Sequence, residues 1–538
     1  MHRTTHPPTH RISRAEWLAV IGVLWIAFAL RTVDLTQVPP GLHNDEVIET
    51  RIAETVADGR LAIFFPEDTG SEGLHYYWAA LFIDVFGHGV YALRLPAVFL
   101  SLISLCVVWA LTRRLFGPVA ALTASAGFAV AFWPVAFGRI ISHTIMLVPI
   151  AALASYCLWR AWHSTGRRAW LLWGLSGLWL GLSLYAYTAA RVLPVIVVAF
   201  GVYVALTQPI DRRRWWTGIA VLLAVAAMVA LPLGVVLWQN PELDDLYFFE
   251  IDRPLTELRR GNLEPVAQTA LQTLGMFAFV GDPLPYYTIP GHAPGDVRPG
   301  ASLTEQVYSQ GRPVFEPIGA LMLLAGMLIS LRRWRQPEYA FIVLWFFLSL
   351  VPGMLSQPAP NSTRTLGSQV VVFALIGIAV AAIVARWRHP LVVAALGLLF
   401  VGNLVWTATD YFRVWPTIDT VRYWHNSGLK AVADSLQADP DTTPAAICLP
   451  DELIDERRPW WKPGWQHMRY LLNRPDLSLR YYNCVDAMVL LDGPARYAVP
   501  DAPAAAADAG KLRDCGQQAG DFVSRHIVAF LEDPHGFS

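Results

Sequence analysis

The stretch WLAVIGVLWIAFAL, residues 17–30, is an apolar run with Arg14 before it and Arg31 after it. Its length approaches the roughly 20 apolar residues that a helix needs to cross a bilayer. Such a run could be the core of a signal peptide or a first transmembrane helix. No small-residue cleavage motif follows it, because residues 32–40 lead directly into an acidic loop. The sequence therefore favours an uncleaved helix.

Similar apolar runs recur along the chain. Of the 538 residues, 54% are hydrophobic and only 15% are charged, and the mean hydropathy is +0.39. A water-soluble globule of this size needs more polar side chains to cover its surface. We therefore expect an α-helical polytopic membrane protein with about eleven transmembrane helices. The further spans are predicted at about 91–111, 118–137, 141–161, 169–187, 192–207, 215–238, 315–331, 339–356, 367–385 and 390–408.

Arginine is concentrated in every second connection between these spans. The positive-inside bias assigns such basic segments to the cytoplasm. The amino terminus is then cytoplasmic, whereas the loops 32–90 and 239–314 and the region after 409 face outward. The arginines of the basic segments are Arg3, Arg11, Arg14, Arg113, Arg114, Arg160, Arg167, Arg168, Arg212, Arg213, Arg214, Arg332, Arg333, Arg335, Arg386 and Arg388.

The first outward loop contains the sequence GLHNDE, residues 41–46, whose acidic pair Asp45 and Glu46 begins a helix-like stretch over 47–59. The helix dipole favours acidic residues in a first turn, so the pair could be only a solvated helix start. Its position beside a membrane span favours a functional interpretation. Residues 75–86 are rich in aromatics, as is typical of an interfacial helix or of an aromatic belt before the next span. Another interfacial helix is expected at about 265–279.

The composition becomes polar and charged after residue 409. Helix-like stretches at 420–437 and 465–472 alternate with strand-like runs at 445–449 and 487–491, which predicts a small extracytoplasmic α/β domain. The expected domains are therefore a transmembrane module, 1–409, and a C-terminal domain, 410–538. Three of the chain's five cysteines fall in the second domain. There Cys484 and Cys515 could form a disulfide, which leaves Cys448 over.

Ionisable residues gather at the outward ends of the predicted spans, where a charge near hydrocarbon is seldom kept without a partner or a ligand. Each alone could be a side chain that reaches to the interface. Arginine suits phosphate through bidentate hydrogen bonds, and a carboxylate can act as a general base toward a hydroxyl or an amine. The set is Asp45, Glu46, Glu72, Arg94, Arg139, His143, Arg191, His292 and Arg364.

His43, Asp45 and Glu46 could also hold a divalent cation, although their spacing is not diagnostic of a metal site. Nucleic acid is not an expected partner, because no basic patch is interleaved with aromatic residues.

The order of several short motifs resembles that of a known family. The motifs are the Asp45-Glu46 pair, EGLHYYW at 72–78, RLPA at 94–97, YAYTAAR at 185–191 and PAPNSTR at 358–364. Over residues 15–410 this order is similar to that of the bacterial glycosyltransferases related to dolichyl-phosphate-mannose protein mannosyltransferases, within the C-type membrane superfamily.

The resemblance implies a hexosyltransferase that moves a sugar, with inversion, from a polyprenyl-phosphate donor to a protein, lipid or glycan acceptor. The reaction would take place at the outer face of the bacterial cytoplasmic membrane. Asp45 matches the family's catalytic acid/base position, and Glu46 is its neighbour. The residues expected to bind substrate are Glu72, His75, Arg94, Arg139, Tyr187, Arg191, His292 and Arg364.

The chain departs from the family at two positions, which leaves the acceptor open. His143 stands where relatives often carry an acidic residue, and Glu72-Gly73 replaces the Lys-Pro-Pro of the aminoarabinose-transferase branch. Two other classes remain open. A polysaccharide or lipid transporter would be expected to show an internal repeat and charges at mid-membrane. An O-antigen polymerase or ligase would be expected to carry its large functional loop late in the chain.

Overall fold

The computed structural model describes residues 12–67, 70–241, 243, 254–291, 310–449, 464–482, 495–498 and 500. The described chain divides into two compact units. The first, called here the bundle unit, contains residues up to 33, 60–78 and 95–411. The second, called the loop unit, contains residues 34–59, 79–94 and those described from 412 onward.

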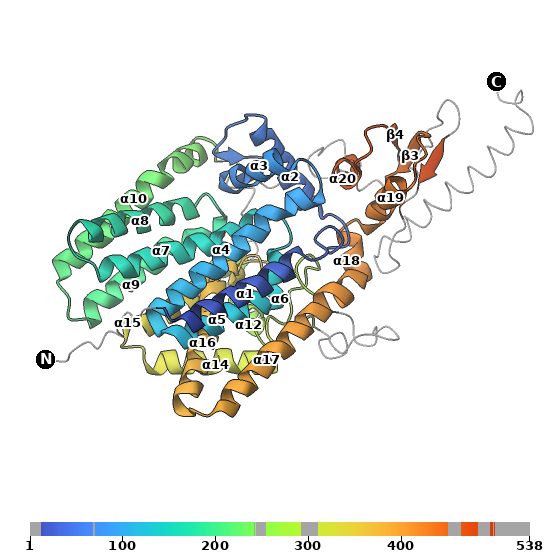
Figure 1. The fold of residues 1–538 in the computed structure, drawn as a ribbon. Helices are drawn as coiled ribbons and strands as arrows, with labels where there is room; N and C mark the ends of the chain where they lie inside the picture. Colours follow the sequence, from blue (N-terminus) through green and yellow to red (C-terminus); the bar gives the residue numbers. More distant parts are fainter. Residues whose placement is uncertain are drawn as a thin grey trace, which may run out of the picture. The chain divides into compact units, whose positions relative to one another are not determined.

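Helices make up the bundle unit, and most of the predicted spans coincide with one of them or with a helix continued by a short turn (Figure 1). The span predicted at 118–137 is instead divided at Ala131 into α5 and α6. Figure 1 shows α7, α8, α9 and α10 side by side. The helices are α1 (Arg14–Thr32), α4 (Val90–Phe116), α5 (Pro118–Val130), α6 (Phe132–Phe137), α7 (Leu147–Trp162), α8 (Gly166–Ser183), α9 (Leu193–Thr207), α10 (Arg212–Gln239), α12 (Glu264–Gly275), α14 (Pro317–Arg332), α15 (Pro337–Met354), α16 (Gln369–Arg386) and α17 (Pro390–Thr409).

The length and composition of these helices confirm a polytopic membrane fold. Within the described residues, 8 helical segments are long and apolar enough to cross a membrane. The apolar helices α5 and α14 are shorter. The predicted interfacial helix at 265–279 corresponds to α12, which ends at Gly275.

Small residues allow several of these helices to pack closely. A Cβ atom at Gly177 in α8 would collide with the carbonyl of Leu222 in α10, and one at Gly326 in α14 would collide with Leu375 in α16. Because lipid tails are as apolar as the side chains, membrane helices associate through such close packing rather than through the hydrophobic effect.

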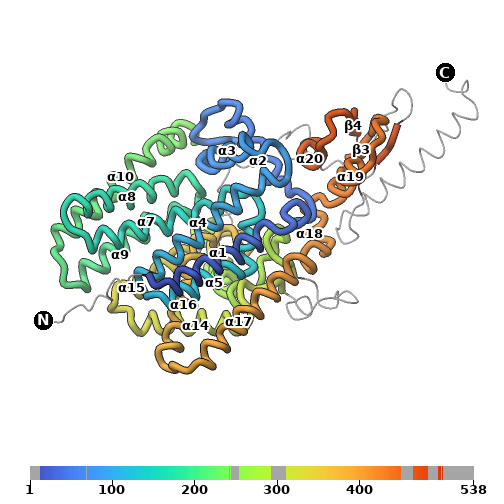
Figure 2. The backbone as a smooth tube through the Cα atoms, in the orientation of Figure 1, coloured from blue at the N-terminus to red at the C-terminus, as the bar shows by residue number. Residues whose placement is uncertain are grey.

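The loop unit contains the predicted small α/β fold. Its sheet has the order β4-β3-β5 and is parallel, with β3 (Ala445–Cys448) between β4 (Leu479–Tyr482) and β5 (Arg496–Ala498). Buried apolar residues of α19, β3 and α20 form one core. Figure 2 shows these three elements next to one another. The helices of the unit are α2 (Asn44–Ala57), α18 (Asp419–Trp424), α19 (Ser427–Ala438) and α20 (Gly464–Leu471).

The helix predicted over 420–437 is divided into α18 and α19. Asn426, at the break, has a left-handed backbone with φ of 50°. Asparagine tolerates this conformation better than most residues. The strand predicted at 487–491 lies outside the described residues.

The first loop follows its prediction closely. The expected helix over 47–59 is α2, and the aromatic stretch forms α3 (Leu74–Phe86). Between them, β1 (Phe64–Phe65) pairs antiparallel with β2 (Ser71–Glu72). The predicted boundary at residue 409 stays a prediction, but residues 34–59 belong to the same unit as the residues after 412.

Cys106 and Cys157 are free thiols, whereas Cys448 is disulfide-bonded. Cys448, which the predicted Cys484–Cys515 pairing leaves without a partner, is therefore part of a disulfide. Cys484 and Cys515 lie outside the described residues.

Candidate active site

The Asp45-Glu46 pair lies at the start of α2, and the helix cap separates the two carboxylates. His43 is the N-cap: its backbone N–H donates to Glu46 Oε2 at 3.0 Å, and its Nδ1 accepts from the Asp45 N–H at 3.2 Å. This reciprocal arrangement is a capping box, which satisfies amides that have no partner within the helix. Glu46 is consequently drawn inward, while the Asp45 side chain remains 49% exposed.

Arg94 neutralises the buried Glu46. Its Nε donates to Glu46 Oε1 at 3.0 Å and its Nη2 donates to Glu46 Oε2 at 3.2 Å, and both side chains are 0% exposed. The remaining guanidinium hydrogens reach the carbonyl oxygens of Leu35, at 2.8 Å, and Gly41, at 2.5 Å. A buried pair of this kind persists only with good geometry and further hydrogen bonds. Arg94 therefore fixes the loop that leads into α2.

His43 is neutral in this setting. Burial lowers its pKa to about 4, although the charges of Glu46 and Glu49 oppose that shift. An Nδ1 that accepts the Asp45 amide hydrogen cannot itself carry a proton. The 3.5 Å approach of His43 Nδ1 to Asp45 Oδ2 is therefore not an ion pair.

Residues after 412 support the same loop within the loop unit. A Cβ atom at Gly41 would collide with the His425 carbonyl, so only glycine fits there. The Asn426 Nδ2 donates to the Leu42 carbonyl at 3.0 Å and to Asn44 Oδ1 at 3.2 Å. Asn426 also lies 3.1 Å from His467 Nε2. Asp45 thus follows a segment held by residues nearly 400 positions later in the chain.

A second contact region lies along α2. Glu54 is buried and meets His88 Nδ1 at 2.7 Å, Arg469 Nη2 at 3.2 Å and the Tyr470 hydroxyl at 3.0 Å. Burial, together with the Glu54 charge, raises the pKa of Tyr470, so the phenol donates the hydrogen bond. These contacts tie α2 to α20.

In the bundle unit, the structure brings together four of the residues singled out from the sequence. Glu72, at the end of β2, is 1% exposed, and burial raises its pKa, while the nearby charges of His143 and Arg191 act in the opposite direction. The ring of His143 lies edge-on to Tyr187 with 5.6 Å between centroids. Arg191 is exposed. The cluster combines a buried carboxylate with an accessible guanidinium.

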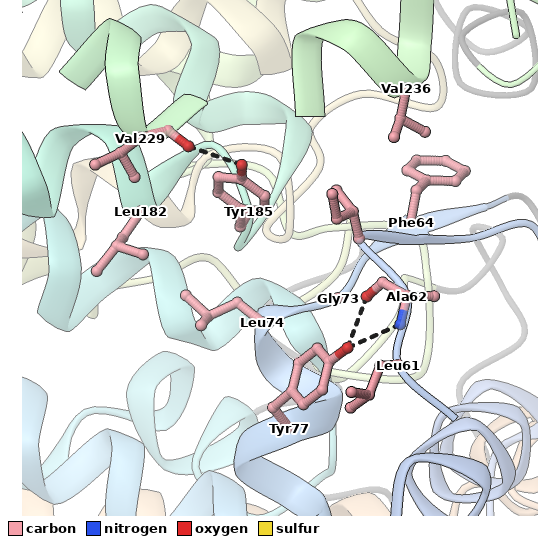
Figure 3. Close-up of a pocket in the computed structure, with 11 residues that line it drawn as sticks. Leu61, Ala62, Phe64, Gly73, Leu74, Tyr77, Leu182, Tyr185, Val229 and Val236 are labelled. Carbon is pink, nitrogen blue, oxygen red and sulfur yellow. Dashed lines mark hydrogen bonds between the residues drawn. The ribbon is translucent and has the colours of Figure 1, made fainter. Parts of the chain in front are cut away.

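Residues next to this cluster in the sequence line an apolar cavity of about 690 Å³ (Figure 3). They are Gly73, which follows Glu72, and Tyr185, which lies two residues before Tyr187. Protein groups satisfy its hydroxyls: Tyr77 donates to the Ala62 carbonyl at 2.9 Å, and Tyr185 donates to the Val229 carbonyl at 2.7 Å. Figure 3 shows aliphatic side chains such as Leu182 around the remaining space. The cavity therefore offers hydrocarbon surface rather than hydrogen bonds.

The other predicted residues have different surroundings. Arg139 is fully buried, donates to the Leu30 carbonyl at 2.8 Å and lies 5.3 Å from the Tyr411 ring centroid. His75 is buried against Tyr76. His292 lies outside the described residues.

Arg364 is half-buried in a loop that Asp282 holds from another segment. Asp282 Oδ2 accepts from both the backbone N–H and the hydroxyl of Ser362, each at 2.6 Å. Burial raises the pKa of Asp282 to about 6, against the effect of those hydrogen bonds. The Arg364 N–H donates to Asn361 Oδ1 at 2.9 Å. The loop therefore presents Arg364 from a fixed turn.

Sequence reasoning did not identify Asp282, His425, Asn426 or His467. Neither periodicity nor a local motif marks them, because their partners lie in distant segments. The buried pair between Arg312 Nε and Asp410 Oδ2, at 2.7 Å, was missed for the same reason.

The described residues contain no group of three or more His, Cys, Asp and Glu side chains placed to hold a metal ion.

Comparison with known proteins agrees with the sequence motifs. Residues 74–238 match the dolichyl-phosphate-mannose-protein mannosyltransferase family. This segment is similar to that family, and the chain as a whole is an α-helical membrane protein. No curated protein matches it.

Three solved structures are similar to parts of this chain at low identity, each with a TM-score under 0.5. ArnT from Cupriavidus metallidurans, bound to undecaprenyl phosphate, has a TM-score of 0.49 and 13% identity over 86% of this chain and 86% of ArnT. The oligosaccharyltransferase AglB from Archaeoglobus fulgidus, in complex with an inhibitory peptide and a dolichol-phosphate, has a TM-score of 0.49 and 15% identity over 86% of this chain and 64% of AglB. The chain thus spans less than two thirds of the length of AglB. The Pmt1–Pmt2 complex of S. cerevisiae, bound to the sugar donor, has a TM-score of 0.37 and 18% identity over 43% of this chain and 34% of that one.

Proposed function

We propose that the protein is an inverting glycosyltransferase that moves a sugar from a polyprenyl-phosphate donor to an acceptor at the outer face of the cytoplasmic membrane. The observation that carries the proposal is the division of the acidic pair: Glu46 is buried and neutralised by Arg94, whereas Asp45 is half-exposed at a helix start. The match of residues 74–238 to the mannosyltransferase family supports the same reaction class.

In the proposed reaction the acceptor oxygen attacks the anomeric carbon, and the bond from that carbon to the phosphate oxygen breaks. The electron pair leaves with the lipid phosphate, which is already a stable anion and needs no protonating acid. The acceptor proton passes to the Asp45 carboxylate. A single displacement of this kind inverts the anomeric configuration.

We assign the donor phosphate to Arg191 and Arg364. Arg191 is exposed and Arg364 is half-buried, so a ligand can reach both guanidinium groups. Bidentate hydrogen bonding makes guanidinium suited to phosphate. Arg94 is fully engaged by Glu46 and backbone carbonyls and therefore acts by positioning. The apolar cavity beside Glu72 suits the hydrocarbon chain of the donor.

The test is Asp45→Asn, a near-isosteric change that removes the proton acceptor. With polyprenyl-phosphate-mannose as donor and water as provisional acceptor, sugar release should fall by about 10²–10⁴-fold, the usual contribution of a general base. Donor binding should survive. The matched control is Asp58→Asn, the same change at an exposed position that ends the same helix. Normal turnover in Asp45→Asn would remove the catalytic role, and the identity of the native sugar should follow from mass spectrometry of co-purified lipid.

A further inference from the structure

A second cavity of the bundle unit is a long groove of about 460 Å³ between α5, α14, α16 and α17. Its lining begins near the ends of α16 and α17 that contain Val384 and Val393 and reaches Glu316 and Asn403 at the opposite ends. Figure 2 shows the orange helix α17 running beside these elements. The groove therefore extends along much of the length of the spanning helices.

The groove faces the hydrocarbon of the membrane, because only 6% of the most apolar stretch of the helical segment that contains α17 is buried within the protein. Its walls are aliphatic and aromatic, with Phe315, Phe373 and Phe400 among them. Membrane-spanning surfaces with no protein cover are covered by lipid, so the occupant is a hydrocarbon chain.

The polar end of the groove indicates which lipid head group can bind there. Among the described residues that line the groove, Glu316 alone is charged, and its Oε2 accepts from Asn403 Nδ2 at 2.9 Å. A carboxylate at this end repels an anionic head group and attracts an ammonium group. A primary ammonium can also donate hydrogen bonds, which a quaternary ammonium cannot.

We propose that this groove is a binding site for an aminophospholipid of the phosphatidylethanolamine type, with one acyl chain along the groove and the ammonium at Glu316. The site differs in charge from the arginine-containing cluster that we assign to the donor phosphate. Its occupancy does not depend on the glycosyl-transfer proposal, so the two can fail separately.

Two glycines of α17 provide a matched test. Gly397 lines the groove, and a Cβ atom there would meet nothing within 4 Å, so Gly397→Phe should fill the groove without disturbing the helix. Gly402 belongs to the same helix, also has open space around it and does not line the groove, so Gly402→Phe is the control. Glu316→Gln removes the charge and keeps the size of the side chain.

The measurement is lipid retention by native mass spectrometry after incubation with phosphatidylethanolamine or phosphatidylglycerol of identical acyl chains. The wild type and Gly402→Phe should retain phosphatidylethanolamine about fivefold better, the preference that one partly exposed ion pair can supply. Gly397→Phe should lose the retained lipid, and Glu316→Gln should retain both lipids equally.

Three results would overturn the proposal. The first is equal retention of the two lipids by the wild type, and the second is unchanged retention in Gly397→Phe. The third is displacement of bound phosphatidylethanolamine by undecaprenyl phosphate at equal concentration, which would make the groove a site for the donor chain.

Discussion

Asp45 and Glu46 are neighbours with opposite environments, and the capping box accounts for the difference. The third residue of a capped helix folds back onto the N-cap amide, so Glu46 turns inward to the His43 N–H and meets Arg94 there. Asp45, one residue earlier, keeps a side chain that is 49% exposed. We infer that Glu46 contributes to activity by holding the loop rather than by exchanging protons.

This interpretation predicts a stability difference between two substitutions. Arg94→Met leaves Glu46 buried without its cation and should lower the free energy of unfolding by about 3–5 kcal/mol. Asp45→Asn, at a half-exposed side chain, should change it by less than about 0.5 kcal/mol. Thermal unfolding in detergent measures both. Equal unfolding temperatures for Arg94→Met and the wild type would show that the pair is not structural.

The lowered pKa of His43 predicts that the stability of the fold depends on pH. Its folded pKa of about 4 lies below the ordinary value of 6.5, so between these values the unfolded chain binds more protons than the folded one. Stability should therefore rise with pH across this window and fall on acidification, by up to about 3 kcal/mol. His43→Asn keeps a good N-cap and removes the titration.

The measurement is the unfolding temperature between pH 4.5 and 7. The wild type should lose more stability on acidification than His43→Asn. The control is His389→Asn, because His389 is also an N-cap whose Nδ1 accepts a backbone amide hydrogen, at Leu391, but it is exposed. Parallel curves for the wild type and His43→Asn would contradict the assignment of the effect to His43.

At this scale the sequence could single out Asp45 and Glu46 as candidates, because the pair is local and stands beside a predicted membrane span. It could not show which carboxylate is buried, since that depends on Arg94, 48 positions away. The contact between Asn426 and Leu42 spans 384 positions. The local composition of neither segment predicts this contact.

At the scale of elements, hydrophobic periodicity located the helices well, because spanning segments must be apolar along their whole length. The break between α18 and α19 escaped prediction for a physical reason. Residues 420–437 have helical composition throughout, and the break is set by tertiary contacts of His425 and Asn426. Similarly, α12 ends before the predicted end because the chain turns at Met276, whose carbonyl accepts from Val314.

The loop that carries Arg364 provides a test of element positioning. Asp282 binds Ser362 through two hydrogen bonds, so Asp282→Ala should release the loop. Hydrogen bonds to a charged group contribute about 1.5–3 kcal/mol each. Affinity for polyprenyl-phosphate-mannose should fall by about tenfold or more, as misplacement of a binding group does. Arg364→Lys, which keeps the charge without the bidentate fork, should also weaken binding.

A double substitution tests whether Asp282 affects donor binding through Arg364. If Asp282 acts through Arg364, then Asp282→Ala should add little to Arg364→Ala. Fully additive losses would show that Asp282 affects donor binding by another route.

At the scale of the molecule, the loop unit constrains the topology independently of charge. Residues 34–59, directly after α1, form one compact unit with residues that follow α17. Two segments of one polar unit must lie on the same side of the membrane. The chain between residues 59 and 412 therefore crosses an even number of times, which agrees with the sequence prediction of one span before this region and ten within it.

The last prediction is that the loop unit lies outside and the arginine-rich connections lie inside. The alternating arginines determine which side is cytoplasmic, through the positive-inside bias. The compact loop unit requires residues 34–59 and the residues from 412 onward to lie on the same side of the membrane. Reporter fusions at Asp58 and Asp439 should both indicate the extracytoplasmic side, and a fusion at Arg213, in the first turn of α10, should indicate the cytoplasm. A topology in which Asp58 and Asp439 report opposite sides would contradict the compact loop unit itself. If all three fusions report one side, the predicted number of spans is wrong. If Asp58 and Asp439 agree but report the cytoplasm, the fold stands and the orientation is reversed, so that Asp45 would face cytoplasmic donors and the proposal of transfer at the outer face would fail.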